Sequence, residues 1–218
     1  MHAASLRDPT RPRAPEVTRQ AAAGPALDIV RLIHPSDLRR LPPTLRRRFE
    51  AGHGPAVYHG AMDFERSACG AVFAWLARAF GAPLAARRAT GAPVTVDVRA
   101  AGDGVAWSRQ LGASQRVRSV KSAGPGGTVL ERTDGGLGMV LDVSVEDGAL
   151  VFTSRSFFLA VGRWRVPIPA TLTPGRCRVE HRAVDDARFR FTLTMVHPLW
   201  GTTFRQTGIF TESQESPL

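Results

Sequence analysis

The chain contains little cysteine and no long apolar run. Its 218 residues include only two cysteines, Cys69 and Cys177, so neither a disulfide framework nor a cysteine-based zinc site is indicated. No uninterrupted apolar stretch approaches the roughly 18 residues that span a bilayer. The Arg- and Pro-rich start, MHAASLRDPTRPRAPEVTRQ, lacks the apolar core of a secretory signal. We therefore expect a cytoplasmic protein with no membrane partner.

Familiar catalytic motifs are also missing from the sequence. It has no GxSxG motif, no GxxxxGK phosphate loop and no pair of histidines at metal-ligand spacing. The Gly-rich stretch SAGPGGT opens no predicted helix, so it predicts a turn between strands and not a phosphate cradle. We expect no cofactor and no bound metal.

Lysine is nearly absent, although the chain is strongly basic. Its formal net charge is +10, yet Lys121 is the only lysine, which indicates an arginine-biased composition. Aromatic residues make up 7% of the chain and do not alternate with arginine as a base-stacking surface would require. A solvated basic surface is the preferred interpretation, and nucleic-acid binding is a weak alternative.

What is present divides the chain into a tail and one domain. We expect residues 1–25 to be a disordered Arg- and Pro-rich tail, residues 26–212 to form a single barrel-like domain, and residues 213–218 to be flexible. Within the domain, 26–52 predicts two short helices. A longer helix is predicted over ERSACGAVFAWLARAFGAP, where apolar residues recur at helical spacing and Gly and Pro follow.

After Pro93 the apolar pattern alternates with a period of two almost to the end. Glycine-rich turns, such as Asp147-Gly148, separate about eight to ten predicted strands. So many consecutive antiparallel strands favour curling or closure, because an open sheet would expose long edges. The expected fold is α+β, with N-terminal helices packed on a large curled antiparallel β-sheet or β-barrel, as in a lipocalin-like or START-like cup.

Charged residues occupy the apolar phase of three predicted strands. Arg109 shares its phase with Trp107, Glu131 shares one with Val129, and Arg155 shares one with Phe157. If these phases face one interior, Glu131 is the counter-ion for the arginines. Ser119 lies in the phase of Val117 and would complete a polar patch, whereas Glu180 has a solvated face as its simpler interpretation. The candidate ligand-binding residues are Trp107, Arg109, Ser119, Glu131, Arg155, Phe157 and Glu180, with Arg109 and Glu131 as the catalytic candidates.

The order of several short motifs resembles a known family. LPPTLRRRFEAGHG, WSRQLG, LERTDGGLGMVLDV, VPIPATLTPGRCRVEHR and RFRFTLTMVHPLWGTTFRQTG occur in the order found in the bacterial family called domain of unknown function 4166. The fixed points that this resemblance implies fall on Trp107, Arg109, Glu131, Pro167, Pro169, Pro174, Pro198, Gly201 and Gly208. The chain departs from the family at Leu111, where an aromatic residue is usual, and at Phe204, where tyrosine is usual.

Three functions remain open from the sequence. The leading hypothesis is a barrel that binds a hydrophobic small metabolite with a polar or acidic end, and that as an enzyme would catalyse a cofactor-free cyclisation or isomerisation in secondary metabolism. The family resemblance implies a second possibility, an accessory module for an NAD-dependent oxidoreductase partner, although this chain contains no dinucleotide-binding segment. The third is nucleic-acid binding. An Arg-Glu-Arg network that only fixes strand register is the structural alternative to a site.

Overall fold

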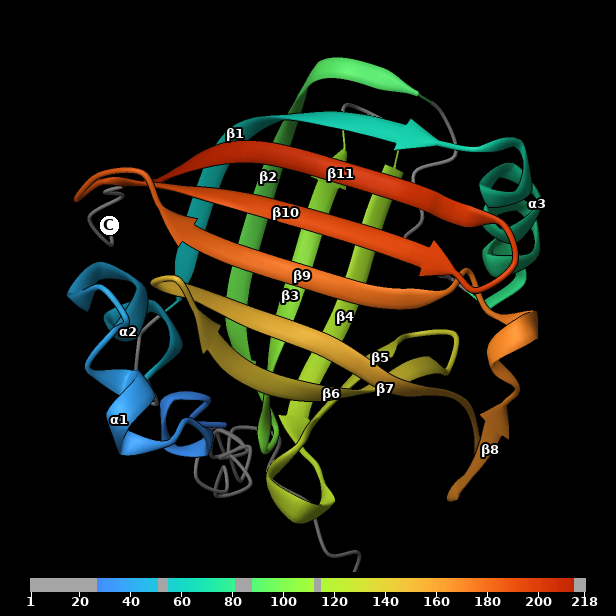
Figure 1. Ribbon diagram of the computed structural model, residues 1–218, viewed down its shortest axis with the longest axis horizontal. Coiled ribbons are helices and arrows are strands. Elements are labelled where there is room, and N and C mark those ends of the chain that lie inside the picture. The colour runs from blue at the N-terminus through green and yellow to red at the C-terminus, as the bar shows by residue number, and fades with distance from the viewer. Residues whose placement is uncertain (1–26, 51–54, 81–87, 112–114, 214–218) are drawn as a thin grey trace, which may run out of the picture.

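A computed structural model describes residues 27–50, 55–80, 88–111 and 115–213 (Figure 1). Alternating apolar residues and tight turns give eleven strands: β1 Ala56–Arg66, β2 Ala89–Ala101, β3 Gly104–Leu111, β4 Gln115–Ala123, β5 Val129–Thr133, β6 Leu137–Glu146, β7 Ala149–Val161, β8 Trp164–Ile168, β9 Arg176–Ala183, β10 Arg188–His197 and β11 Gly201–Glu212. The helical elements are η1 Val30–Leu32, α1 Pro35–Leu38, α2 Pro43–Phe49, α3 Ala68–Ala77, η2 Arg78–Phe80, η3 Pro125–Gly127 and η4 Ala170–Leu172. The predicted tail, residues 1–25, lies outside the described residues.

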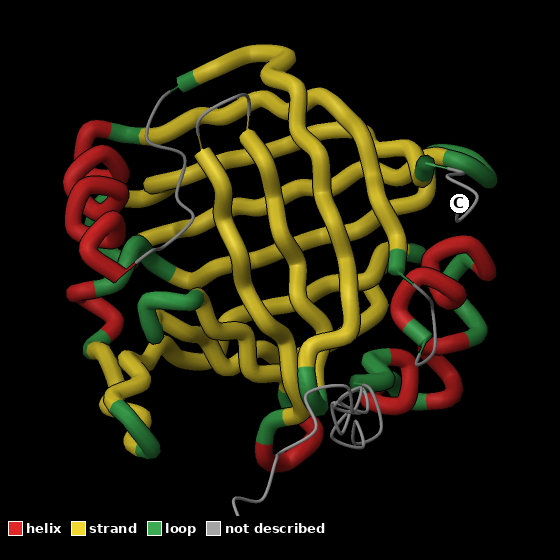
Figure 2. Tube along the Cα trace, turned by 180° about the vertical axis from the view of Figure 1, so that it is seen from behind, coloured by secondary structure: helices red, strands yellow, loops and turns green. Residues whose placement is uncertain are grey.

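Ten of the strands form a closed antiparallel barrel (Figure 2). Each strand from β1 to β7 pairs with the next, β9 pairs with β7, and β10 and β11 follow. The pairing of β11 with β1 completes the closure. Short β8 lies outside this circuit and pairs with the second half of β7. Of the two predicted forms, a curled antiparallel sheet or a β-barrel, the structure has the closed barrel, and it has few helices.

Local sequence explains the β6–β7 turn and the close approach of β1 to β11. Asp147 and Gly148 both adopt positive φ, 48° and 75°, in the β6–β7 hairpin, as a tight two-residue turn requires. At the β1–β11 seam, a Cβ on Gly60 would meet the carbonyl oxygen of Ile209, and one on Gly208 would meet that of Ala61. Glycine at these two positions allows the first and last strands to approach each other.

The helices lie at the two ends of the barrel (Figure 1). At one end, Phe49 of α2 is buried and its ring contacts those of Trp107, Phe152 and His181. At the other end, α3 begins at the cap Ser67 and buries Phe73 and Ala77. No helix within the described ranges is both long enough and apolar enough to cross a membrane.

Two apolar clusters fill the barrel. The larger cluster includes the predicted inward faces of β2 and the first half of β10, with Val94, Val96 and Val98 all buried. The smaller one lies towards α3 and includes Phe73, Phe157, Cys177, Met195 and Phe204. The core therefore runs along the barrel axis, and the polar residues described next interrupt it.

Candidate functional site

Three consecutive strands carry charged side chains into the barrel. Arg109 on β3 and both Lys121 on β4 and Glu131 on β5 line an internal cavity of about 70 Å³. Lys121 lies directly opposite Glu131 in the β4–β5 register, so their side chains share one face of the sheet. The inward guanidinium expected at Arg109 is present, and its phase with Trp107 is the predicted one.

The polar contacts in this cluster converge on one carboxylate oxygen. Lys121 Nζ lies 2.9 Å from Glu131 Oε1, and the Ser119 hydroxyl donates to the same oxygen at 2.7 Å. The Arg109 guanidinium is more distant: Nη2 lies 4.0 Å from Oε1, and Nη1 lies 3.5 Å from the Ser119 oxygen. Lys121 and Glu131 therefore form the tight pair, and Arg109 approaches it with longer contacts.

Burial and charge oppose each other at Glu131. Burial alone would raise the pKa of the carboxyl, but the positive charges of Lys121 and Arg109, with hydrogen bonds from Lys121 and Ser119, lower that pKa to about 2. Burial, together with the positive charge of Arg109, lowers the pKa of the Lys121 ammonium, although the charge and hydrogen bond of Glu131 act in the opposite direction. The cluster holds two basic side chains and one carboxylate in a low-dielectric interior, so its basic groups outnumber its acidic one.

A second, larger cavity opens from the same cluster towards α3. Its volume is about 340 Å³, and apolar side chains from α3, η2, η4 and several strands form most of its wall. Ser119 and Glu131 are polar groups in that wall. Glu131, Met139 and Met195 line both cavities. The apolar space therefore leads from the α3 end of the barrel to the charged cluster.

Aromatic residues close the opposite side of the inner cavity. Trp107 and His181 line it, and Phe49 of α2 packs against both rings. Trp107 Nε1 and His181 Nδ1 are buried without a hydrogen-bond partner among the described residues. Burial, reinforced by the charges of Arg48, Lys121 and Arg109, lowers the pKa of His181 well below its ordinary value. His181 is therefore a neutral ring in this wall.

The structure brings together five of the seven predicted site residues. Trp107, Arg109, Ser119 and Glu131 border the inner cavity or its cluster, and Phe157 lines the outer cavity. The predicted inward orientation of Arg155 is wrong, because its side chain is 61% exposed and pairs with Asp142. The register of β6 and β7 shifts between Val140 and Leu141, where Ser156 and Ser154 are the successive partners. This bulge reverses the phase and leaves Arg155 on the outer surface.

Glu180 also lies away from the cluster. On β9 the residues that line the inner cavity are Val179 and His181, so Glu180 occupies the opposite face. Its carboxylate pairs with Arg182 at 2.9 Å and with Arg178 at 3.5 Å. Glu180 therefore lies on the solvated face of the sheet, as its simpler interpretation predicts. It does not take part in the interior site for which it was a candidate.

Lys121 and His181 are the residues that the sequence analysis missed. Lys121 follows Val117 and Ser119 at a spacing of two, so its strand phase already indicated an inward side chain. A single lysine among so many arginines is itself a signal, beyond what it indicates about composition. His181 shares the phase of Cys177 and Val179, so its inward direction also follows from the alternation of its strand.

Fold and cluster together define a class of protein: a closed meander β-barrel with an apolar interior that ends on a buried Lys-Glu-Arg cluster. A family model, described as Domain of unknown function (DUF4166), matches residues 41–210. The chain belongs to this family. The matched range contains every strand of the barrel except the end of β11. No curated protein matches the chain.

Proposed function

We propose that the barrel binds a small molecule with a hydrophobic body and an anionic or polar end. The observation that carries this proposal is the continuity of the apolar cavity of about 340 Å³ with the charged cluster, through Glu131, Met139 and Met195. Small-molecule sites are typically apolar cavities of about 300–1,000 Å³ with a few convergent polar groups. In this proposal the barrel serves as a lipocalin-like cup.

The charges orient the ligand. Lys121 and Arg109 share a single carboxylate, so an anionic group of the ligand would balance the second cation. Arg109 is the group that contacts it, because among the described residues its guanidinium has only these two long contacts, and it presents donors in a fork that fits a carboxylate. The hydrophobic body would then occupy the outer cavity beside Phe157 and Ile168.

The electrostatics favour binding over proton transfer. A carboxyl with a pKa of about 2 is ionised at neutral pH and is a weak general base. Stabilisation of negative charge is the chemistry that this cluster performs best. In an enzymatic version, the same two cations would stabilise an enolate during a cofactor-free isomerisation or cyclisation, and the cavity wall would hold the substrate in its reactive shape.

A matched pair of fluorescent probes tests the charge recognition. 1-Anilinonaphthalene-8-sulfonate has an apolar body and an anionic end, and N-phenyl-1-naphthylamine has the same body without the sulfonate. Arg109→Leu should weaken binding of the sulfonate about tenfold or more, as loss of a buried charged partner does, and should leave the neutral probe almost unchanged. Arg155→Leu is the control, because this arginine lies on the outer surface. Equal effects of both substitutions would contradict the proposal.

The position of the ligand body needs its own variant. Ala77 of α3 is buried in the wall of the outer cavity, so Ala77→Phe should fill that space and weaken both probes. Its exposed neighbour Ala79 offers the control Ala79→Phe, which should bind both probes like wild type. Thermal unfolding of each variant shows whether the fold is retained. If Ala77→Phe folds and still binds both probes normally, the outer cavity is not the site.

A further inference from the structure

The exposed apolar residues of this protein are concentrated at the α3 end of the barrel. Eleven of the thirteen large hydrophobic side chains that are exposed among the described residues belong to the segments 67–80, 158–174 and 196–204. We name this set the apolar rim; it consists of Val72, Trp75, Leu76, Phe80, Val161, Trp164, Val166, Leu172, Val196, Leu199 and Trp200. Figure 1 shows α3 and β8 at this same end, opposite α1 and α2.

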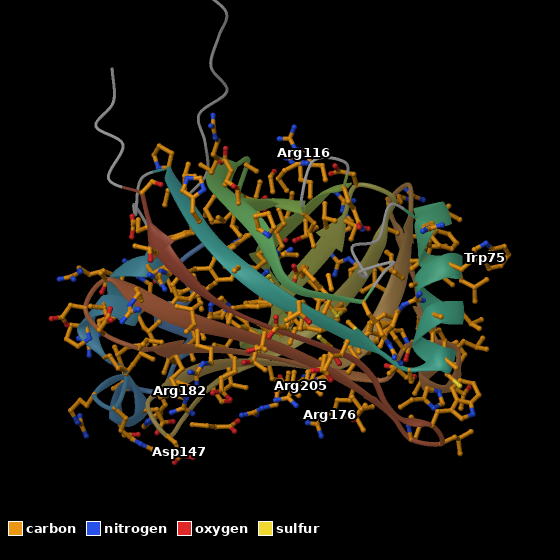
Figure 3. All side chains as sticks on the ribbon, turned by 90° about the horizontal axis from the view of Figure 1, so that it is seen from above. Trp75, Arg116, Asp147, Arg176, Arg182 and Arg205 are labelled. Carbon is orange, nitrogen blue, oxygen red and sulfur yellow. The ribbon has the colours of Figure 1, made fainter. Side chains whose placement is uncertain are left out.

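Contacts between the three segments hold the rim together. Phe73 of α3 packs on Trp200 of the β10–β11 turn, with ring centroids 5.7 Å apart. The ring of His197 stacks on Trp200, and its Nε2 lies within hydrogen-bonding distance, 3.3 Å, of the Thr171 carbonyl oxygen. Trp75 points away from the barrel on the outer side of α3 (Figure 3) and is 68% exposed. The rim is therefore a supported surface made of projecting side chains.

The charged residues in the three segments that carry the rim are all basic. The three segments contain Arg78, Arg163 and Arg165 but no aspartate or glutamate, and all three arginines are exposed. Three of the four tryptophans in the chain, Trp75, Trp164 and Trp200, are also exposed in the rim. Tryptophan with its partly polar ring, leucine and arginine together form the composition that binds the interface of a bilayer carrying anionic lipids.

The outer cavity opens within this surface. Leu76, Phe80 and Leu172 are exposed members of the rim, and the same three residues line the cavity of about 340 Å³. We propose that the apolar rim docks the α3 end of the barrel on an anionic lipid surface, with tryptophan and leucine side chains in the interface and the arginines on the headgroups. A hydrophobic ligand would then pass between bilayer and cavity without crossing water. This replaces the expectation of no membrane partner.

Co-sedimentation with vesicles tests the docking. The full chain is mixed with vesicles of phosphatidylcholine alone or of equal parts phosphatidylcholine and phosphatidylglycerol. We expect binding to the anionic vesicles, weaker binding to the neutral ones, and a decrease as salt rises, because salt screens the arginine contacts. Arg163→Glu/Arg165→Glu should weaken anionic binding about tenfold or more. Absence of wild-type binding to anionic vesicles would overturn the proposal.

Matched controls separate the rim from general hydrophobicity and charge. Trp75→Ser/Trp164→Ser/Leu199→Ser should abolish binding, whereas Val184→Ser/Ile209→Ser should not, because it changes the two large hydrophobic residues that are exposed outside the rim in the described part of the chain. Likewise Arg190→Glu/Arg205→Glu alters two exposed arginines on the barrel wall and should bind nearly as well as wild type. If either control loses binding as strongly as its rim counterpart, the rim is not the docking surface.

A second copy of the chain is the alternative partner that could cover the rim. Sedimentation velocity of wild type and of the triple rim variant, both without vesicles, measures this self-association directly. Monomers in both samples support the lipid proposal. A wild-type dimer that the triple variant abolishes would assign the rim to a second copy and overturn the proposal. The ligand-binding proposal is tested with probes in water and with Arg109 and Ala77 variants, so its failure and this one are distinguishable.

Discussion

A single carboxylate oxygen organises the interior at the scale of the residue. Glu131 Oε1 on β5 accepts from Lys121 and Ser119, which both lie on the adjacent strand β4. The pair is buried, so removal of one partner leaves the other charge in a low-dielectric space. Because of this cost, substitution of Glu131 or Lys121 should lower the stability of the protein. Substitution in the exposed pair of Arg155 and Asp142 should not.

We predict that Glu131→Gln lowers the free energy of unfolding by about 3 kcal/mol at pH 7. The wild-type carboxyl has its pKa lowered to about 2, below its unfolded value. Its contribution is therefore complete above about pH 4.5 and is lost as pH falls towards 2. The difference between wild type and Glu131→Gln should shrink over the same window in urea titrations. Asp142→Asn is the control, and a loss as large there would contradict the prediction.

His181 gives a second pH-dependent prediction. Its folded pKa lies well below the ordinary value, so below about pH 6.5 the unfolded chain binds a proton that the folded chain does not. The free energy of unfolding should fall by up to about 1.4 kcal/mol per pH unit below pH 6.5. His181→Phe should reduce this slope, and His59→Gln, at an exposed position, should keep it. A wild-type slope in His181→Phe would show that other groups cause the decline.

At the scale of the element, β7 determines how the barrel and β8 are joined. Its first half pairs with β9, from Leu150 to Thr153, and its second half pairs with β8, from Phe157 to Val161. Between the two halves, the Ser154 hydroxyl accepts a hydrogen bond from the Cys177 amide at 2.8 Å. A side chain thus replaces the backbone acceptor where the β7–β9 ladder ends.

Ser154→Ala should therefore destabilise the protein by about 1–3 kcal/mol, the cost of a buried amide without an acceptor. Ser156→Ala, at an exposed position of the same bulge, should change stability by less than about 0.5 kcal/mol. Chemical denaturation of both variants measures the difference. Equal stability of the two variants would mean that the Ser154 hydroxyl does not complete the ladder.

Strand phase decides how much of the site the sequence could predict. Val94, Val96 and Val98 follow a regular alternation, and so do Trp107 and Arg109, so their inward direction was predictable. Arg155 was misplaced because a bulge inserts one residue, and no turn residue marks it in the sequence. The sequence also does not predict which charged residues of neighbouring strands lie opposite each other, because this depends on the register of strand pairing. Lys121 shows this, since only its pairing opposite Glu131 reveals its role.

At the scale of the whole molecule, closure joins the first strand to the last strand. β11 pairs with β1 on one side and with β10 on the other. Removal of β11 would expose two long edges and open the apolar interior. The fold therefore depends on its last strand, although the charged cluster lies on β3, β4 and β5.

A chain that ends at Trp200 should lack a cooperative unfolding transition, because the barrel cannot close without β11. A chain that ends at Ser213 keeps all eleven strands and should unfold cooperatively near the wild-type midpoint. Circular dichroism during thermal unfolding distinguishes the two. A sharp transition in the shorter chain would show that the remaining strands form a stable sheet alone.

The residues of the charged cluster lie close together in the sequence. Arg109, Ser119, Lys121 and Glu131 all come from one continuous stretch of three strands, whereas the cavity walls use strands from the whole domain. If the barrel binds a ligand as proposed, exchange of residues 104–133 between members of this family would transfer the recognition of the ligand's charge as a unit. The proposed preferences for ligand charge and for ligand shape would then change separately in evolution, through substitutions in different parts of the sequence.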